Sequence, residues 1–170
     1  PSPVIRLFSF LLPKGELSVR IHWGGDSIDH TVAPVLTSEP AVPVPHTLSP
    51  CPEAQGVLTP VPLIRLAYGR SGDKGDQANI GIIARQAEYL PYIWTALTPE
   101  VVANCFSHFL DGRVERFLLP GIHAINFVLH DVLGGGGIAS LRNDAQGKGY
   151  AQILLAQPID LPAPLAERIS

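Results

Sequence analysis

Proline is unevenly distributed along this chain of 170 residues, and its distribution limits where a fold can form. Ten of the 17 prolines lie in the first 60 residues, and seven of those ten lie at positions 34–60. Proline has no backbone N–H and a fixed φ, so this density excludes helices and central strands there. We expect residues 34–60 to be an extended, semi-rigid linker. The main fold is therefore expected to begin at residue 61.

The residues before the linker have the pattern of β-strands. Residues 4–12 form a nearly continuous apolar run, and residues 16–23 alternate between apolar and polar side chains. The Gly24-Gly25-Asp26 sequence is typical of a hairpin turn, and a third strand is expected through residues 28–32. We predict a short β-meander over residues 1–33, and a meander of this size is marginally stable unless its apolar face is covered. Because the chain lacks Met and begins in strand-like sequence, we interpret it as the tail of a longer polypeptide.

From residue 61 onward the chain reads as an α+β domain, a small mixed sheet with helices on one face. The predicted elements are a strand at 62–68, a polar loop at 69–77, a strand at 79–84, a helix from Leu90 to 97, a second helix to 111, a strand at 113–119, a third helix at 122–133, and a hairpin of strands 138–143 and 150–157. The second helix is marked by Thr98 as the N-cap and Pro99 at its first position. We place the domain at 61–158 and a C-terminal tail at 159–170.

Composition excludes several classes of protein. Hydrophobic residues make up 46% and charged residues 16%, which is too apolar for a disordered chain. A net charge of −3 with only 12 Lys and Arg argues against nucleic-acid binding. No apolar run approaches the roughly 20 residues of a membrane span. Two cysteines cannot make a disulfide scaffold or a four-thiolate metal site, so we expect a reducing compartment, most simply the cytoplasm. The sequence predicts no cofactor.

Residues 69–77 combine three glycines with charged and hydroxyl side chains. The glycines are Gly69, Gly72 and Gly75, and the candidate anion-binding side chains are Arg70, Ser71 and Lys74. Such a stretch suits a phosphate or carboxylate bound by inward-turned N–H groups. It lacks the Gly-Lys-Ser/Thr ending of a nucleotide-binding loop. Two alternatives stay open: oxygen ligation of Mg²⁺ or Ca²⁺ by Asp73, Asp76 and Asn79, or a surface turn whose acids and bases pair with each other.

A second candidate set lies on the predicted third helix. His123, Asn126 and His130 are spaced i, i+3 and i+7, so they share one helix face. That face is either the solvated side of the helix or an acid/base and orienting set. The four glycines at 134–137 indicate flexibility, close backbone approach or a path beside a ligand, with the cation Arg142 nearby.

Other polar or reactive residues are assigned structural roles. Cys105 falls on the apolar stripe of the second helix and is expected to be a core thiol. His108 falls on the polar face of the same helix and is expected to be solvated. Glu115 and Arg116 alternate on a strand and are expected at its edge or in solvent. No Ser-His-Asp order, paired-carboxylate motif or metal-hydrolase signature is present.

Eight motifs occur in a fixed order between residues 62 and 158. They are LAYGRSGDKGD at 66–76, ANIGIIAR at 78–85, VER at 114–116, LP at 119–120, NFVLH at 126–130, the glycines at 134–137, SLR at 140–142 and DAQGK at 144–148. In this ordered set the chain resembles the small C-terminal domain of the acyclic terpene utilisation (AtuA-like) family. The resemblance implies a ferredoxin-like fold that follows a larger module, with residues 1–33 as the closing strands of that module. The predicted element order does not match that fold, so either the helix at 122–133 or the strand at 79–84 is wrong.

The family is associated with bacterial breakdown of citronellol and geraniol through acyl-CoA intermediates. The resemblance therefore implies a domain of that pathway, acting within a larger assembly and as a homo-oligomer. One hypothesis is an accessory domain whose Arg70, Ser71, Gly72, Asp73, Gly75, Asp76, Asn79, Asn126 and Arg142 contribute to an acyl-CoA or carboxylate site completed by the larger module or another subunit. A second is part of a lyase- or hydratase-like active site with Lys74 or His130 as the acid/base. A third is a structural interaction module without a ligand.

Overall fold

The computed structural model describes residues 10–31, 33, 48, 50–52 and 56–169. These residues belong to two compact units, one ending before residue 46 and the other continuing to the C-terminus. The first unit contains a β-hairpin of β1 (Val19–Trp23) and β2 (Asp26–His30), joined by Gly24 and Gly25 with φ of 57° and 95°. This hairpin confirms the predicted turn. The predicted first strand lies mostly outside the described residues, and the rest of it is not strand.

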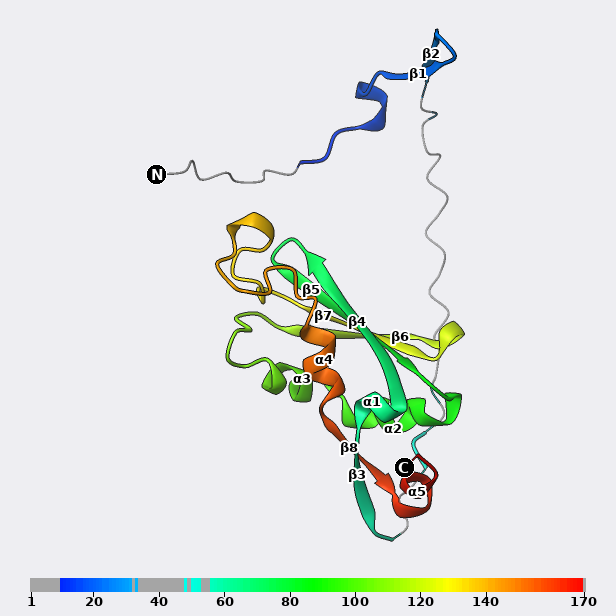
Figure 1. Cartoon of the computed structure of the whole chain (residues 1–170), viewed down its shortest axis with the longest axis vertical. Helices are drawn as coiled ribbons and strands as arrows, with labels where there is room; N and C mark the ends of the chain where they lie inside the picture. The colour runs from blue at the N-terminus through cyan, green and yellow to red at the C-terminus, as the bar shows by residue number, and fades with distance from the viewer. Residues whose placement is uncertain (1–9, 32, 34–47, 49, 53–55, 170) are drawn as a thin grey trace. The chain divides into compact units, whose positions relative to one another are not determined.

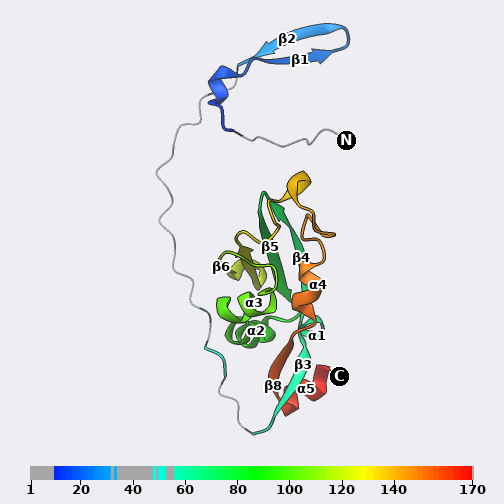
Figure 2. The same cartoon turned by 90° about the vertical axis from the view of Figure 1, so that its left-hand side faces the viewer.

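The second unit is built on a four-stranded sheet. Its strands are β4 (Ala67–Lys74), β5 (Gln77–Ala84), β6 (Val114–Leu119) and β7 (Ala124–Leu129), in the spatial order β4-β5-β7-β6. Every neighbouring pair is antiparallel, so the α+β class is confirmed but the sheet is not mixed. Figures 1 and 2 show the strands together with the helices α2 (Leu90–Ala96), α3 (Pro99–Cys105) and α4 (Tyr150–Leu155).

A two-stranded ribbon joins the two ends of this unit. The strands β3 (Leu58–Pro62) and β8 (Pro158–Pro162) pair antiparallel, flanked by the short helices α1 (Leu63–Leu66) and α5 (Ala163–Ile169). Without the ribbon and its flanking helices, the elements follow the chain order β4, β5, α2 with α3, β6, β7 and α4. If the order is started at β7 and continued from α4 back to β4, it becomes β7, α4, β4, β5, α2 with α3, and β6. This is the β-α-β-β-α-β order of a ferredoxin-like domain, cut between α4 and β4. The ribbon forms where the two ends of this rearranged domain meet. Residues 58–60, predicted as the end of the linker, and residues 159–169, predicted as the tail, are therefore folded.

Five predicted elements are wrong in type, and one of them is the strand predicted at 138–143, where the structure has a 3-10 turn at Gly137–Ala139 and no strand. The helix predicted at 122–133 is the central strand β7, preceded by a 3-10 turn at Pro120–Ile122. The glycine-rich loop is most of β4, and only Gly75 and Asp76 form the turn to β5. The strand predicted at 150–157 is helix α4, whose buried residues Tyr150, Ala151, Leu154 and Leu155 follow helical spacing. A helical turn, α1, also replaces most of the strand predicted at 62–68.

Other predictions are confirmed. The Val101 backbone N–H donates to Thr98 Oγ1 at 3.2 Å, which makes Thr98 the N-cap of α3. Helix α2 begins at Leu90 after a 3-10 turn at Ala87–Tyr89, and β5 and β6 lie where strands were predicted. Further 3-10 turns occupy Lys14–Glu16 and Gly137–Ala139.

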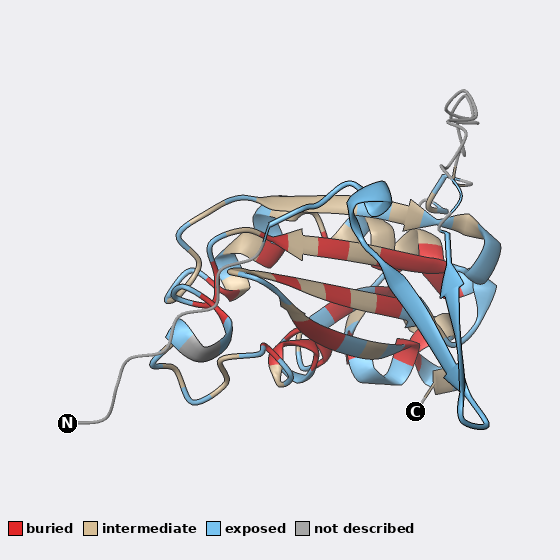
Figure 3. Ribbon diagram, turned by 90° about the horizontal axis from the view of Figure 1, so that it is seen from above, coloured by how far each residue is buried: buried red, intermediate tan, exposed pale blue. Residues whose placement is uncertain are grey.

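The core forms between the helices and one face of the sheet. Side chains of β5 and β7 alternate, and Ile80, Ile82, Ile125 and Phe127 are almost completely buried with helix residues such as Phe106. Figure 3 shows this alternation as red residues separated by tan and blue ones along the strands. Among the described residues, no helix has the length and apolar character required to cross a membrane.

Candidate functional site

The sheet has an outer face that the described helices do not cover. Register identifies the residues on it: Arg70 of β4 pairs with Gly81 of β5, Gly81 with Asn126 of β7, and Asn126 with Phe117 of β6. These positions alternate with the core residues of the same strands, and side chains of successive strand residues point to opposite faces. Each predicted site residue on a strand can therefore be assigned to the core face or to the outer face.

Five predicted site residues form a polar strip on the outer face. They are Arg70, Lys74, Asn79, Asn126 and His130. The Asn79 Nδ2 donates to Asn126 Oδ1 at 3.3 Å, and Lys74 Nζ lies 3.5 Å from Asn79 Oδ1. The two amides are half-buried, while Arg70 and Lys74 are exposed. Two separate sequence segments thus supply cationic and amide donors to one surface.

His130 continues the outer face just beyond the end of β7. Its Nε2 lies 3.0 Å from Glu115 Oε1, and Glu115 also accepts a short hydrogen bond from Arg113. The hydrogen bond from Arg113 is the largest cause that lowers the pKa of Glu115, and His130 lowers it further. With its side chain 19% exposed, His130 is held in position by an ionised carboxylate. This arrangement suits an imidazole that exchanges a proton through its other ring nitrogen.

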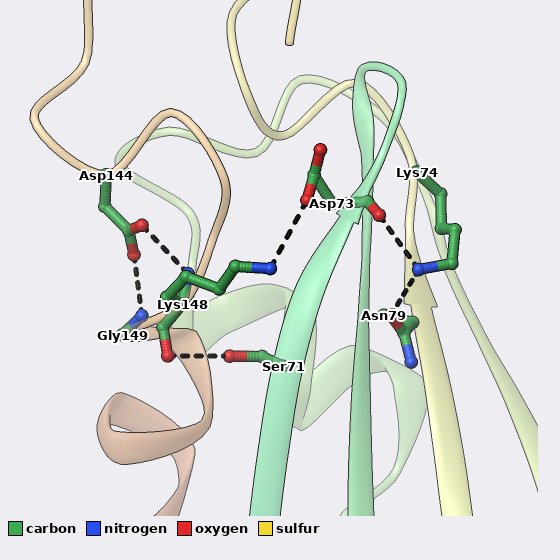
Figure 4. A network of polar contacts seen from close by, with 7 residues as sticks. All are labelled: Ser71, Asp73, Lys74, Asn79, Asp144, Lys148 and Gly149. Atoms are coloured by element: carbon green, nitrogen blue, oxygen red, sulfur yellow. Dashed lines mark hydrogen bonds and ion pairs between the residues drawn. The ribbon is translucent and has the colours of Figure 1, made fainter. Parts of the chain in front are cut away.

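Ser71 and Asp73 lie on the opposite side of β4, as Figure 4 shows. The Ser71 hydroxyl donates to the Lys148 carbonyl at 3.1 Å and accepts from the Ala151 N–H at 2.9 Å. Asp73 Oδ1 lies 3.5 Å from Lys148 Nζ. Gly72, between them in the strand, pairs with Asn79 and belongs to the outer face, where a Cβ on it would be 3.1 Å from Lys148 Nζ. The contacts of Ser71 and Asp73 fasten β4 to the start of α4, on the side of the strand away from the polar strip.

The tip of the β4–β5 hairpin is fixed by the glycine run. Asp76 Oδ1 accepts from the N–H groups of Leu133 and Gly135, at 3.2 and 2.8 Å. Gly136 lies so close that a Cβ on it would be 2.0 Å from the Gly75 carbonyl oxygen. Close backbone approach therefore explains Gly136, and all four glycines of the run have positive φ. Asp76 and Gly75 are parts of this packing. The metal alternative is not supported, because Asp73 faces Lys148, Asp76 binds backbone and Asn79 lies on the outer face.

Arg142 does not reach the polar strip. Its Nη1 donates to the Phe109 carbonyl at 2.9 Å and, in a shorter bond, to the Val132 carbonyl. The guanidinium carbon lies 5.4 Å from the centre of the Phe109 ring. Arg142 therefore ties the loop after the glycine run to the turn after α3.

Two residues expected at a strand edge or in solvent make specific contacts. Arg116 donates to the carbonyls of Trp94 and Leu97, at 2.5 and 2.8 Å, and lies 3.6 Å above the Trp94 ring. Glu115 holds His130, as described above. Both residues lie on β6, an edge strand of the sheet, as expected, but neither of their contact partners was predicted from the sequence. Glu115 and Phe117 are two residues apart on one strand, so they share the outer face. This spacing was already visible in the sequence.

The three residues still to be placed, His123, Cys105 and His108, lie outside the polar strip. His123 sits in a turn with φ of 51°, outside the polar strip. Burial raises the pKa of the Cys105 thiol, as expected of a core thiol. His108 is exposed, and its ring meets the edge of Phe109 with centroids 4.0 Å apart.

An apolar row crosses the outer face beside the polar strip. Tyr68 pairs with Ile83, Ile83 with Ala124, and Ala124 with Leu119. The large side chains Tyr68, Ile83 and Leu119 are 58%, 43% and 41% exposed, and Phe117 is 46% exposed. Arg85 lies 3.8 Å above the Tyr68 ring. The outer face therefore offers hydrophobic contact next to cationic and amide donors.

The family of this chain follows from its match to a family model. The model of the AtuA ferredoxin-like domain matches residues 61–160, more than half of the chain. Neither a curated protein nor a solved structure gave a match. The matched range spans the four-stranded sheet, its helices and half of the closing ribbon. By its sequence and its fold, the chain belongs to the AtuA ferredoxin-like domain family.

Proposed function

We propose that this chain is an accessory domain in bacterial acyclic terpenoid catabolism that supplies half of an anion site. The ligand would be a carboxylate or an acyl-CoA ester, held at the polar strip. A larger module or another subunit would complete the site over the outer face. The observation that carries the proposal is the grouping of Arg70, Lys74, Asn79 and Asn126 on one uncovered face of the sheet.

Charge on the outer face supports an anionic ligand. The cations there are Arg70, Lys74, Arg85 and Arg113, and the one acid identified on the described part of this face is Glu115, which already pairs with Arg113. The chain as a whole carries −3, so positive charge is concentrated on this surface. Guanidinium and ammonium groups bind carboxylates and phosphates through charge-assisted hydrogen bonds, and the amides add neutral donors.

The openness of the surface supports a shared site. Arg70 and Lys74 are exposed, and the apolar row lies beside them on the same face. Exposed apolar side chains rimmed by polar residues are typical of interaction surfaces. A second protein surface over the outer face would desolvate the cations and strengthen their contacts with an anion.

The test is a thermal-shift titration of the full chain with CoA, an acyl-CoA ester, phosphate and Mg²⁺. We expect stabilisation by the acyl-CoA ester that grows with its concentration, as ligand binding to the folded state requires. Arg70→Gln and Lys74→Gln should each weaken the apparent affinity by about tenfold, because each removes a charged donor.

The matched control is Arg168→Gln. Arg168 is an exposed arginine on α5 that pairs with Glu88 at 2.8 Å, so the variant loses the same charge from another element. Its affinity should equal that of the parent chain. Equal affinities for Arg70→Gln, Lys74→Gln and Arg168→Gln, or no binding at millimolar ligand, would contradict the anion site.

A second candidate function is part of an acyl-CoA lyase- or hydratase-like active site, and the His130–Glu115 contact of 3.0 Å favours it. In that case His130 exchanges the proton, Glu115 positions it, and Lys74 is the alternative acid/base. The assembled protein should lose most of its turnover in His130→Gln, with ligand affinity unchanged. Full turnover in that variant would exclude His130, and the same measurement on Lys74→Gln would then decide the role of Lys74.

A further inference from the structure

A second concave surface lies on the helical side of the domain, distinct from the polar strip. It is a cavity of about 490 Å³ between the turn after α3, the loop at 142–144 and the start of α4. This size falls within the range of about 300–1,000 Å³ that small-molecule sites occupy. Neither the polar strip nor the family match accounts for it.

The walls of the cavity are largely aromatic and aliphatic. The rings of Phe109 and Tyr150 pack with centroids 5.1 Å apart, and the His108 ring meets Phe109 at 81°. Ile153 of α4 is 37% exposed and forms part of the same lining. The Tyr150 hydroxyl donates to the Val132 carbonyl at 3.0 Å, so its ring is fixed. Rigid ring edges and faces of this kind favour a flat aromatic ligand.

Polar groups with donors line the same cavity. Arg142 is held there by its bonds to two carbonyls, and His108 and Asn143 are exposed at the wall. The one carboxylate in the lining, Asp144, accepts the N–H groups of Lys148 and Gly149 at 2.8 and 2.7 Å. The charge of Asp144 is therefore directed toward backbone donors. This leaves Arg142, His108 and Asn143 as the donors that suit an acceptor group of a ligand. A few polar groups beside apolar walls are the usual composition of a ligand site.

We propose that this cavity binds a small aromatic carboxylate. Its ring would lie against Phe109, Tyr150 and Ile153, and its carboxylate would face Arg142, Asn143 and His108. The site is independent of the proposed anion strip, because its lining comes from the turn after α3, the loop before α4 and α4 itself rather than from the outer face of the sheet.

The test is a titration of the ¹⁵N-labelled full chain with 2-naphthoate, followed by amide chemical shifts. We expect saturable shifts of one-to-one stoichiometry at His108, Phe109, Asn143 and Tyr150. Cyclohexanecarboxylate, which has the anion without the aromatic ring, and 2-naphthamide, which has the ring without the charge, should each bind about tenfold more weakly.

Ile153→Glu and Ile83→Glu form a matched pair of variants. Both residues are partly exposed isoleucines, 37% and 43%, but Ile83 lies on the outer face. Ile153→Glu should weaken 2-naphthoate binding at least about tenfold, and Ile83→Glu should leave it unchanged. Non-saturable shifts, shifts confined to the outer face, or equal affinities of the two variants would overturn the proposal. Loss of CoA binding in Arg70→Gln tests the other site and leaves this result unaffected.

Discussion

Arg70 and Ser71 are neighbours in the sequence, but β4 turns their side chains to opposite faces of the sheet. Arg70 stands on the exposed outer face, and the Ser71 hydroxyl bonds to the first turn of α4. A stretch predicted as one anion-binding loop is therefore divided between residues of the outer face and residues that pack against α4. At the scale of single residues, the alternation of a strand decides which candidates can act together.

Ser71→Ala should destabilise the domain by about 1–3 kcal/mol, because the buried Ala151 N–H would lose its acceptor. Urea unfolding followed by circular dichroism measures this change. Ser107→Ala, at an exposed serine, is the control and should stay within about 0.5 kcal/mol of the parent. Equal stability of the two variants would show that the hydroxyl does not fasten β4 to α4.

Glu115 should make stability depend on acidity. Its pKa in the folded chain is lowered, chiefly by the hydrogen bond from Arg113, below the ordinary value of 4.5. A depressed folded-state pKa contributes stability above the unfolded-state pKa, and this contribution is lost as the pH falls through the lowered value. The urea midpoint of Glu115→Gln should therefore fall less than that of the parent when the pH drops below 4.5.

The control for Glu115→Gln is Glu167→Gln, at an exposed glutamate of α5. This variant should keep the acid dependence of the parent chain. If the parent and Glu115→Gln lose stability in parallel on acidification, the Arg113–Glu115–His130 network does not hold an ionised carboxylate.

At the scale of elements, glycine was the main source of error in the sequence analysis. Gly69 sits inside β4 because a Cβ there would be 3.0 Å from Leu155 Cδ1, so the glycine lets α4 approach the strand. The sequence alone shows a glycine-rich polar stretch, which is equally typical of a loop. The approach of a helix that follows some 80 residues later in the sequence cannot be deduced from local pattern.

The strand β7 was predicted as a helix for a related reason. Ile125, Val128, Leu129 and Val132 fit a helical stripe, while Ile125, Phe127 and Leu129 fit a strand. Because β7 carries apolar side chains on both faces, such as Phe127 and Val128, its sequence fits the period of a helix as well as that of a strand. Asn126 and His130 lie on the same face of the strand, as they would have done on the predicted helix.

The glycine run provides a matched prediction. Gly136 and Gly137 have φ of 66° and 49°, but only at Gly136 would a Cβ meet backbone, the Gly75 oxygen at 2.0 Å. Gly137→Ala should cost about 1–2 kcal/mol from backbone conformation alone. Gly136→Ala should cost more, because the β4–β5 turn must also move. Urea unfolding of both variants checks the order, and equal losses would contradict the close approach.

At the scale of the whole molecule, the unit that contains the four-stranded sheet is closed by the ribbon of β3 and β8. Leu161 of β8 is fully buried although it lies outside the four-stranded sheet. The sequence predicted the α+β class and the family, but it assigned these residues to a linker and a tail. Pro60 and Pro162 obscured the strands, because proline is compatible only with strand edges.

Leu161→Ala should cost about 2–5 kcal/mol, the usual effect of truncating a fully buried leucine. Leu119→Ala removes the same atoms from a position that is 41% exposed on the outer face, and it should cost much less. Denaturant unfolding compares them. Similar losses would mean that the ribbon is not part of the core.

The central claim is that the outer face of the sheet, rather than the helical side, receives the acyl-CoA ester. The most direct measurement is the side-chain amide spectrum of the ¹⁵N-labelled full chain during titration with an acyl-CoA ester. The account predicts saturable shifts of the Asn79 and Asn126 side-chain NH₂ groups, which Arg70→Gln and Lys74→Gln weaken and Arg168→Gln preserves. Unmoved Asn79 and Asn126 signals, with shifts confined to the helical side or absent altogether, would contradict it.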